Sequence, residues 1–197
     1  MFLLGGEMNI TPTRLKGCLL ISNIIHSDNR GYFIELFRST RFKKITKHPF
    51  QPVQTNLSFS HSGTVRGIHF STVQNGQNKI VSCVNGRIND YLIDLRRESA
   101  TFGQWEKIEL TQQNGVSIYI ASGFGHAFQA LEENTIVVYH VDSEYSESNE
   151  KSISIYDDHI NLKFDKPITH ISDKDLKAPN LHETEKNHGL PNDLMQL

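Results

Sequence analysis

Cysteine is scarce in this 197-residue sequence, which contains only Cys18 and Cys83. The two lie far apart and neither belongs to a CxxC pair, so a disulfide framework or a zinc knuckle has no basis. Such cysteine usage favours a reducing cytoplasm. No apolar run approaches the roughly 20 residues that a membrane-spanning helix needs. The opening segment 1–8 has no basic leader and no long apolar stretch, which argues against a secretory signal.

An excess of charge of one sign is also missing. The sequence has 20 Lys+Arg and 22 Asp+Glu residues, a net charge of −2, and no basic block. Neither nucleic acid nor a membrane surface is therefore an expected partner, and a small molecule is favoured. What the chain does have is 37% hydrophobic and 9% aromatic residues, more than a disordered chain offers. These values and the length predict one soluble globular domain.

Short β-branched and aromatic runs, separated by turn residues, dominate the chain. Their spacing of about 8 to 12 residues is typical of an antiparallel sandwich or barrel, and we predict an all-β double-sheet roll. Asn85-Gly86 stands between two of these runs and predicts a hairpin with a two-residue type I′ turn. The expected strands cover residues 19–25, 32–37, 53–60, 65–70, 79–84, 87–95, 104–110, 116–120, 126–131 and 135–141.

Little of the sequence favours helix. Residues 39–45 predict a short helix capped by Ser39 or Thr40, and Ser172 begins another with Asp175 in its first turn. From residue 182 the chain is polar, so we expect a domain over 9–181 and a tail over 182–197. The tail should lie on the surface or be partly ordered by a partner, and we assign it no chemistry.

Two of the ten histidines stand inside apolar strands bordered by glycine, namely His69 and His126. Each by itself could be a buried histidine that serves packing, but two on neighbouring strands make a functional site more probable than either alone. Residues 115–126 resemble the second motif of the metal-binding cupins, with Ala121 in place of proline. The first motif fails, because Phe70-Ser71 follows His69 and no His-x-His supplies further ligands. We therefore predict no metal site.

Eight short motifs follow one another in the span from 26 to 181. In order they are Asp28-Asn-Arg-Gly-Tyr-Phe-Ile-Glu35, Gln54-Thr-Asn56, Val65-Arg-Gly-Ile-His69, Asn78-Lys-Ile-Val81, Asp94-Leu-Arg-Arg-Glu-Ser-Ala-Thr-Phe-Gly-Gln-Trp105, Gly123-Phe-Gly-His-Ala-Phe128, Val138-Tyr139 and Ser172-Asp-Lys-Asp175. With these motifs the chain resembles the dTDP-4-dehydrorhamnose 3,5-epimerase family, which includes enzymes of antibiotic deoxysugar pathways. The resemblance implies a metal-free cupin jelly roll with a few short helices, a homodimer, no cofactor, and a dTDP-4-keto-6-deoxyhexose substrate.

The chemistry of that family explains four of the matched residues. A C4 ketone acidifies the protons on C3 and C5, so an epimerase can remove one and return a proton to the opposite face. By resemblance, His69 is the base and Asp175 its dyad partner. Lys79 matches the lysine that stabilises the enolate oxygen, and Tyr139 matches the acid on the other face of the sugar. Without the resemblance, Lys79 would be an ordinary strand lysine and Tyr139 a core residue.

The remaining matches resemble substrate-binding residues. Arg30 and Arg66 suit pyrophosphate recognition, although either could be a structural ion pair. The thymidine side is matched by Phe33, Glu35, Gln54 and Asn56, and polar positions of the sugar pocket are matched by Asp90 and His126. For Glu35 and Asp90, a satisfied strand carboxylate is an equally good interpretation.

Some positions depart from the family pattern. Two adjacent tyrosines are usual shortly after the catalytic one, but Glu144-Tyr145 stands here, and positions 71 and 140 are Ser and His instead of Gln and Lys. The motif ending at Phe128 is more similar to the antibiotic-pathway branch, some of whose members invert only C3. We predict fast proton exchange at C3 of dTDP-4-keto-6-deoxyglucose and slow or no exchange at C5. Two rival classes are a sugar-nucleotide-binding cupin without turnover and a metal-dependent cupin.

Overall fold

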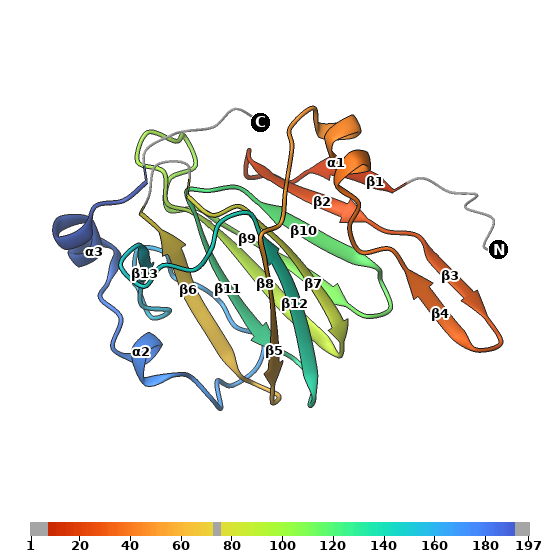
Figure 1. Ribbon diagram of the computed structural model, residues 1–197. Coiled ribbons are helices and arrows are strands. Elements are labelled where there is room, and N and C mark those ends of the chain that lie inside the picture. Colours follow the sequence, from red (N-terminus) through yellow and green to blue (C-terminus); the bar gives the residue numbers. More distant parts are fainter. Residues whose placement is uncertain (1–7, 73–75, 192–197) are drawn as a thin grey trace.

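Two antiparallel β-sheets stacked face to face form the body of the protein (Figure 1). The structure is a computed structural model that describes residues 8–72 and 76–191. The larger sheet has the order β1 (Asn9–Pro12), β2 (Cys18–Ser22), β10 (Val116–Ile120), β7 (Lys79–Asn85), β12 (Thr135–Val141) and β5 (Gln54–Ser60). The smaller has the order β13 (Glu150–Ser152), β6 (Val65–Ser71), β11 (Phe124–Ala130), β8 (Arg87–Asp94) and β9 (Trp105–Thr111). The predicted all-β jelly roll is confirmed.

A hairpin projects from one end of this body. It consists of β3 (Ile25–Asp28) and β4 (Gly31–Ile34), which pair only with each other in the part of the chain described (Figure 1). The sequence predicted one strand over 19–25, but β2 ends at Ser22 and Ile25 already belongs to the hairpin. The short strands β1 and β13 were not predicted, because three or four residues carry too little periodicity.

The predicted hairpin at Asn85-Gly86 is wrong. β7 pairs with β10 and β12 in the larger sheet, whereas β8 pairs with β9 and β11 in the smaller one. Only Gly86 has a positive φ, of 76°, and a Cβ there would meet Thr135 Oγ1 at 2.6 Å. The turn thus carries the chain from one sheet to the other. A turn dipeptide cannot report this, because it fixes the bend and not the partner of the next strand.

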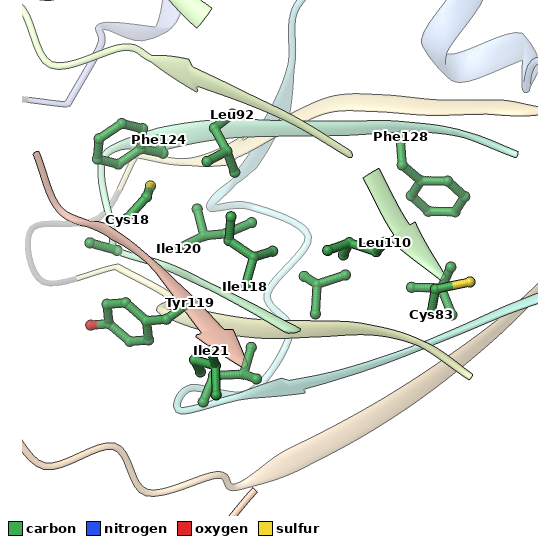
Figure 2. Close-up of a cluster of buried hydrophobic side chains, with 14 of the residues drawn as sticks. Cys18, Ile21, Cys83, Leu92, Leu110, Ile118, Tyr119, Ile120, Phe124 and Phe128 are labelled. Atoms are coloured by element: carbon green, nitrogen blue, oxygen red, sulfur yellow. The ribbon is translucent and has the colours of Figure 1, made fainter. Parts of the chain in front are cut away.

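Hydrophobic side chains from both sheets fill the space between them (Figure 2). Leu92 of the smaller sheet and Ile118 of the larger are fully buried in this cluster. A second cluster covers the other face of the smaller sheet, where Tyr91 and Ile93 meet the segment after β13. Alternate residues of β8 therefore belong to different clusters, as the twofold repeat of a strand requires.

Within the described residues, three short helices pack around the sheets. α1 (Ser39–Thr46) has Arg38 at its N-cap position without a side-chain hydrogen bond, so the predicted capping by Ser39 or Thr40 is wrong. Its fully buried Phe42 lies 5.2 Å from the ring of Tyr119, measured between centroids, and this contact holds α1 against the larger sheet. No helix of the described ranges is long and apolar enough to cross a membrane.

The C-terminal helices hold the last described part of the chain to the body. α2 (Asp173–Leu176) begins after Ser172, whose Oγ accepts from the Asp175 backbone N–H at 3.1 Å, as the sequence predicted. α3 (Leu181–His188) starts with a capping box formed by Asn180 and Glu183. Leu181 and Leu190 are buried in the second cluster, so packing continues past the expected end of the domain at residue 181. Residues 192–197 of the expected tail lie outside the described residues.

Candidate active site

His69 and Asp175, which lie 106 residues apart in the sequence, form a hydrogen-bonded pair. His69 Nε2 is 2.7 Å from Asp175 Oδ1, and the Gly67 N–H donates to Asp175 Oδ2 at 3.3 Å. The Asp175 side chain is only 4% exposed, whereas that of His69 is 38% exposed. The carboxylate is thus fixed inside the protein while the imidazole remains accessible to a ligand.

Asp175 stays ionised in this setting. Burial by itself raises its pKa, but the hydrogen bond and charge of His69, the Gly67 N–H and the Ser172 hydroxyl together lower the pKa below its usual value. Because a carboxylate only accepts hydrogen bonds, His69 Nε2 carries the proton of this contact. Nδ1 makes no bond with another described residue, so it is the nitrogen available as a base.

Gly67 explains how the sheet can place this pair. It has φ of 117°, and a Cβ at this position would lie 2.5 Å from the His126 backbone oxygen. Only glycine therefore lets β6 approach β11 this closely. Its amide is then free to donate to Asp175.

Two cavities share His69 and Lys174. The Lys79 cavity, of about 300 Å³, lies between the sheets at the β6, β7, β12 and β5 strands. The Arg66 cavity, of about 380 Å³, lies between β6 and the α2 region. The Lys79 cavity is lined by Gln54, Asn56, His69, Gln77, Lys79, Tyr139, Tyr145, Glu150, Lys151 and Lys174. The Arg66 cavity is lined by Phe59, Ser60, His61, Thr64, Val65, Arg66, His69, His170, Ile171, Ser172, Lys174 and Asp175.

Lys79 and Tyr139 reach the first cavity from neighbouring strands. Tyr139 lies opposite Val81 of β7, and Lys79 is two residues away from Val81, so both side chains share one face of the sheet. Burial lowers the pKa of Lys79, although the negative charges of Glu150 and Asp90 act to raise it. Burial also raises the pKa of Tyr139, so the phenol keeps its proton. Lys79 Nζ has no hydrogen bond or ion pair within the described residues and is available to a ligand.

His126 and Asp90 form a second pair, on the same face of the smaller sheet as His69. His126 lies directly opposite His69 in the β6–β11 register, and its Nε2 is 2.7 Å from Asp90 Oδ2. Asp90 is fully buried, and its Oδ1 has no partner in the described part of the chain. Neither residue lines the two cavities. No group of three His, Cys, Asp or Glu residues suited to a metal ion occurs within 8–72 and 76–191.

Three predicted substrate residues lie away from both cavities. Arg30 is at the tip of the β3–β4 hairpin, where it pairs with Asp28, and Phe33 of β4 is 49% exposed. Glu35 follows the hairpin and pairs with Arg38 and Arg41. One copy of the chain therefore does not bring these residues to His69, as the projecting hairpin in Figure 1 shows.

Several residues that line the cavities or support them were missed in the sequence. Lys174 lines both cavities, and it stands inside the motif that identified Asp175. Asn78, inside the motif of Lys79, accepts from the Ser122 N–H at 2.9 Å and donates to Asp142 Oδ2 at 2.6 Å, which holds the chain just after β12. Glu150 belongs to no motif and could not have been found without the fold.

The arrangement suits proton transfer at a carbon next to a carbonyl group. A base held by a buried carboxylate, an unpaired ammonium and a protonated phenol line one cavity. The base can take a carbon-bound proton, the ammonium can stabilise the resulting enolate, and the phenol can return a proton from another direction.

Comparison with known proteins gives a consistent result. The chain is 35% identical over 181 residues to a Streptomyces dTDP-4-dehydro-6-deoxyglucose 3-epimerase, covering 91% of this chain and 92% of the relative. It is 36% identical to a dTDP-4-dehydrorhamnose 3,5-epimerase of Mycolicibacterium smegmatis, covering 93% and 91%. A solved 3′-monoepimerase from Streptomyces bikiniensis in complex with dTDP-quinovose superposes with a TM-score of 0.88, at 34% identity and 92% coverage of each chain. The model of the dTDP-4-dehydrorhamnose 3,5-epimerase family matches residues 12–183, and the chain belongs to this family.

Proposed function

We propose that the protein is an epimerase of dTDP-4-keto-6-deoxyglucose, acting at C3 and more slowly at C5. The observation that carries this proposal is that the His69–Asp175 pair opens onto the same cavity as Lys79 and Tyr139. The relatives named above are themselves 3- and 3,5-epimerases, one of them with a dTDP-sugar bound. A protein that only binds the nucleotide sugar would have no use for this acid and base set.

The reaction begins with proton removal by His69. Nδ1 takes the proton from C3, and the ionised Asp175 stabilises the imidazolium that forms. Negative charge moves to the C4 oxygen, where the Lys79 ammonium stabilises the enolate more than the ketone, as catalysis requires. A proton then returns to the opposite face, from solvent or from Tyr139. Only protons move, so the reaction needs no hydride-carrying cofactor.

The charged part of the substrate would extend toward the Arg66 cavity. Arg66 donates to the Phe59 carbonyl at 2.9 Å and to Ser60 Oγ at 3.2 Å, which orients its guanidinium. Lys174 lies at the boundary of the two cavities. Two cations beside the reacting sugar suit a diphosphate. In this proposal the His126–Asp90 pair, which shares a sheet face with His69 but lines neither cavity, supports the site and does not bind the sugar.

A homodimer would complete the site. The hairpin exposes Tyr32 by 53% and Phe33 by 49%, and the edge strand β5 exposes Leu57 by 65% and Phe59 by 47%. Apolar side chains on a sheet edge and on a projecting hairpin need a covering partner. We propose that a second copy supplies Arg30, Phe33 and Glu35 to the nucleoside end of the site. The free thiols of Cys18 and Cys83 agree with a cytoplasmic enzyme.

Mixing two inactive variants tests the shared site. Arg30→Ala removes the hairpin contact and His69→Ala removes the base. A mixed dimer has one site with an intact His69 and an intact partner hairpin, so refolding the two variants together should restore activity. Activity that stays at the level of the separate variants, with dimers present by sedimentation, would exclude the hairpin contribution.

Proton exchange in heavy water tests the function itself. The purified enzyme is incubated with dTDP-4-keto-6-deoxyglucose, and NMR locates the incorporated deuterium. We expect deuterium at C3 within the first turnovers and later at C5. No exchange at either carbon above the rate without enzyme would refute the proposed function.

A further inference from the structure

Ser152 of the edge strand β13 lies directly opposite His69 of β6. The neighbouring residues Ile68 and Ile153 exchange both of their backbone hydrogen bonds, at 3.3 and 3.0 Å. The next pair along an antiparallel ladder is a non-hydrogen-bonded one, in which opposed side chains approach each other most closely. Opposed residues also point to the same face of the sheet, so the Ser152 side chain lies beside the His69 imidazole.

The hydroxyl of Ser152 is buried and unused. Ser152 is 9% exposed, and its Oγ makes no hydrogen bond with any residue in 8–72 or 76–191. Ser152 lines neither of the two cavities, although Glu150 and Lys151 of the same strand line the Lys79 cavity. Burying a hydroxyl without a partner costs free energy, and alanine would fill the same space without that cost. Packing therefore does not account for a serine at this position.

The charge of His69 changes during the proposed reaction, and its neighbours respond differently to the two states. The ionised Asp175 accepts from Nε2–H in both states. A hydroxyl next to the ring can turn its oxygen toward an imidazolium, whose N–H and C–H groups carry positive charge, whereas it gains little from the neutral ring. A contact that is stronger in the charged state lowers the barrier to proton removal by the base.

We propose that Ser152 is a positioning residue whose hydroxyl stabilises the imidazolium form of His69. It acts through His69 and does not touch the substrate. Its part in catalysis rests on the proposed function, whereas its effect on the charge of the imidazole is a property of the free enzyme. Removal of the hydroxyl should therefore change turnover and protonation without loss of stability.

Ser152→Ala separates this role from a structural one. We expect kcat for exchange at C3 of dTDP-4-keto-6-deoxyglucose to fall about fivefold because the base is weaker, with KM within about twofold of wild type. The urea midpoint of unfolding should not fall, because the hydroxyl that is removed has no partner. Ser152→Thr keeps a hydroxyl and should restore kcat to within about twofold of wild type. Equal losses of kcat in the two variants would overturn the proposal.

A second buried serine provides a matched control. Ser82 of β7 is 2% exposed, and its Oγ lies 2.7 Å from Ser117 Oγ. Ser82 follows Val81, which lies on the cavity face of the larger sheet, so the Ser82 side chain points to the other face. Ser82→Ala should lower the urea midpoint and leave kcat within about twofold of wild type. A fall in kcat as large as that of Ser152→Ala would refute a specific role of Ser152.

Protonation of His69 tests the proposal without turnover. In the free enzyme, nitrogen NMR of isotope-labelled histidine follows the charge of each imidazole against pH. Without the hydroxyl the imidazolium is less stable, so the His69 curve of Ser152→Ala should be displaced by about half a pH unit or more toward lower pH.

The displacement reports the hydroxyl because this variant leaves the charged and titratable groups around His69 in place. These groups are Asp175 and Lys174 of α2, Lys79 of β7, Arg66 of β6, His126 of β11, Tyr139 of β12 and Glu150 of β13. A curve that coincides with that of wild type would overturn the proposal. Loss of the proposed function alone would leave this measurement intact, so the two failures are distinguishable.

Discussion

The His69–Asp175 and His126–Asp90 pairs have the same contact geometry and different surroundings. His69 and His126 face each other across β6 and β11, and each has Nε2 2.7 Å from a carboxylate oxygen. The His69 side chain is 38% exposed and borders two cavities, whereas that of His126 is 13% exposed and borders neither. The two pairs differ in the exposure of the imidazole, and we expect the exposed pair to take part in catalysis and the other to contribute to stability.

The largest expected effect is on the exposed pair. His69→Ala removes the base, and Asp175→Asn removes the charge that stabilises its protonated form. Each should lower deuterium exchange at C3 by on the order of 10³-fold while the protein stays folded. The measurement is NMR in heavy water, with circular dichroism to check folding. His182→Ala, at an exposed position of α3, is the control. Wild-type exchange in either dyad variant would contradict the assignment.

A Lys79 variant tests the same comparison, because Lys79 lines a cavity that His69 also lines. Lys79→Ala should lower kcat by roughly 10²-fold, since its partner is the charge that develops on the C4 oxygen. The Kd for dTDP, measured by calorimetry, should change by less than about threefold because dTDP lacks the reacting ketone. Lys151→Ala provides a matched lysine variant that lines the same cavity from the other sheet. If affinity for dTDP fell and kcat held, Lys79 would be a binding residue.

Tyr139 and the loop that follows it should determine how fast the enzyme acts at C5 relative to C3. Glu144 stands where the family usually has a second tyrosine ring. We expect its carboxylate to displace the sugar by about an ångström, which lowers the rate at one carbon on the order of 100-fold. We expect exchange at C5 to be slower than at C3 by about that factor. Tyr139→Phe should abolish inversion at C5 and spare exchange at C3. Equal rates at the two carbons in wild type would show that Glu144 has no such effect.

Disruption of the His126–Asp90 pair should lower the unfolding free energy more than it lowers kcat. His126→Ala leaves the fully buried Asp90 without its hydrogen-bond partner, which should cost about 3 kcal/mol of unfolding free energy. The kcat of the folded fraction should stay within roughly tenfold of wild type. Urea unfolding and saturated kinetics below the unfolding transition measure the two quantities. A loss of kcat as large as that of His69→Ala, at unchanged stability, would make the two pairs equivalent.

The smallest expected effect is the contribution of Asp175 to the pH dependence of stability in acid. Its pKa in the folded protein lies below the usual 3.8. Burial raises the pKa, but the hydrogen bond and charge of His69 and the other donors lower it by more. The unfolded chain then binds the proton more readily, so this contribution to stability is present above about pH 4 and is lost as the pH falls through the folded pKa. Asp175→Asn should flatten the pH dependence of unfolding in that acid range. Asp173→Asn, an exposed neighbour, should leave it unchanged.

The sequence alone determined the fold class and most strands, and it indicated the residues of the candidate site. The motifs of His69, Lys79, Tyr139 and Asp175 selected residues that the structure brings to one region from β6, β7, β12 and α2. The short helix after Ser172 was predictable because a serine cap acts on the residues next to it. Alternation and capping are local, and local patterns can be read in the chain.

Only the tertiary structure decided which of these residues meet. Asn85-Gly86 looked like a hairpin and instead joins two sheets, since the partner of a strand depends on distant segments. Arg30, Phe33 and Glu35 matched the motifs as well as Gln54 did, yet they lie away from the cavities. The matching dyads of His69 and His126 differ in exposure, which sequence patterns do not contain. Burial, hydrogen-bond direction and cavity shape arise from contacts between residues far apart in the chain, and no local pattern encodes them.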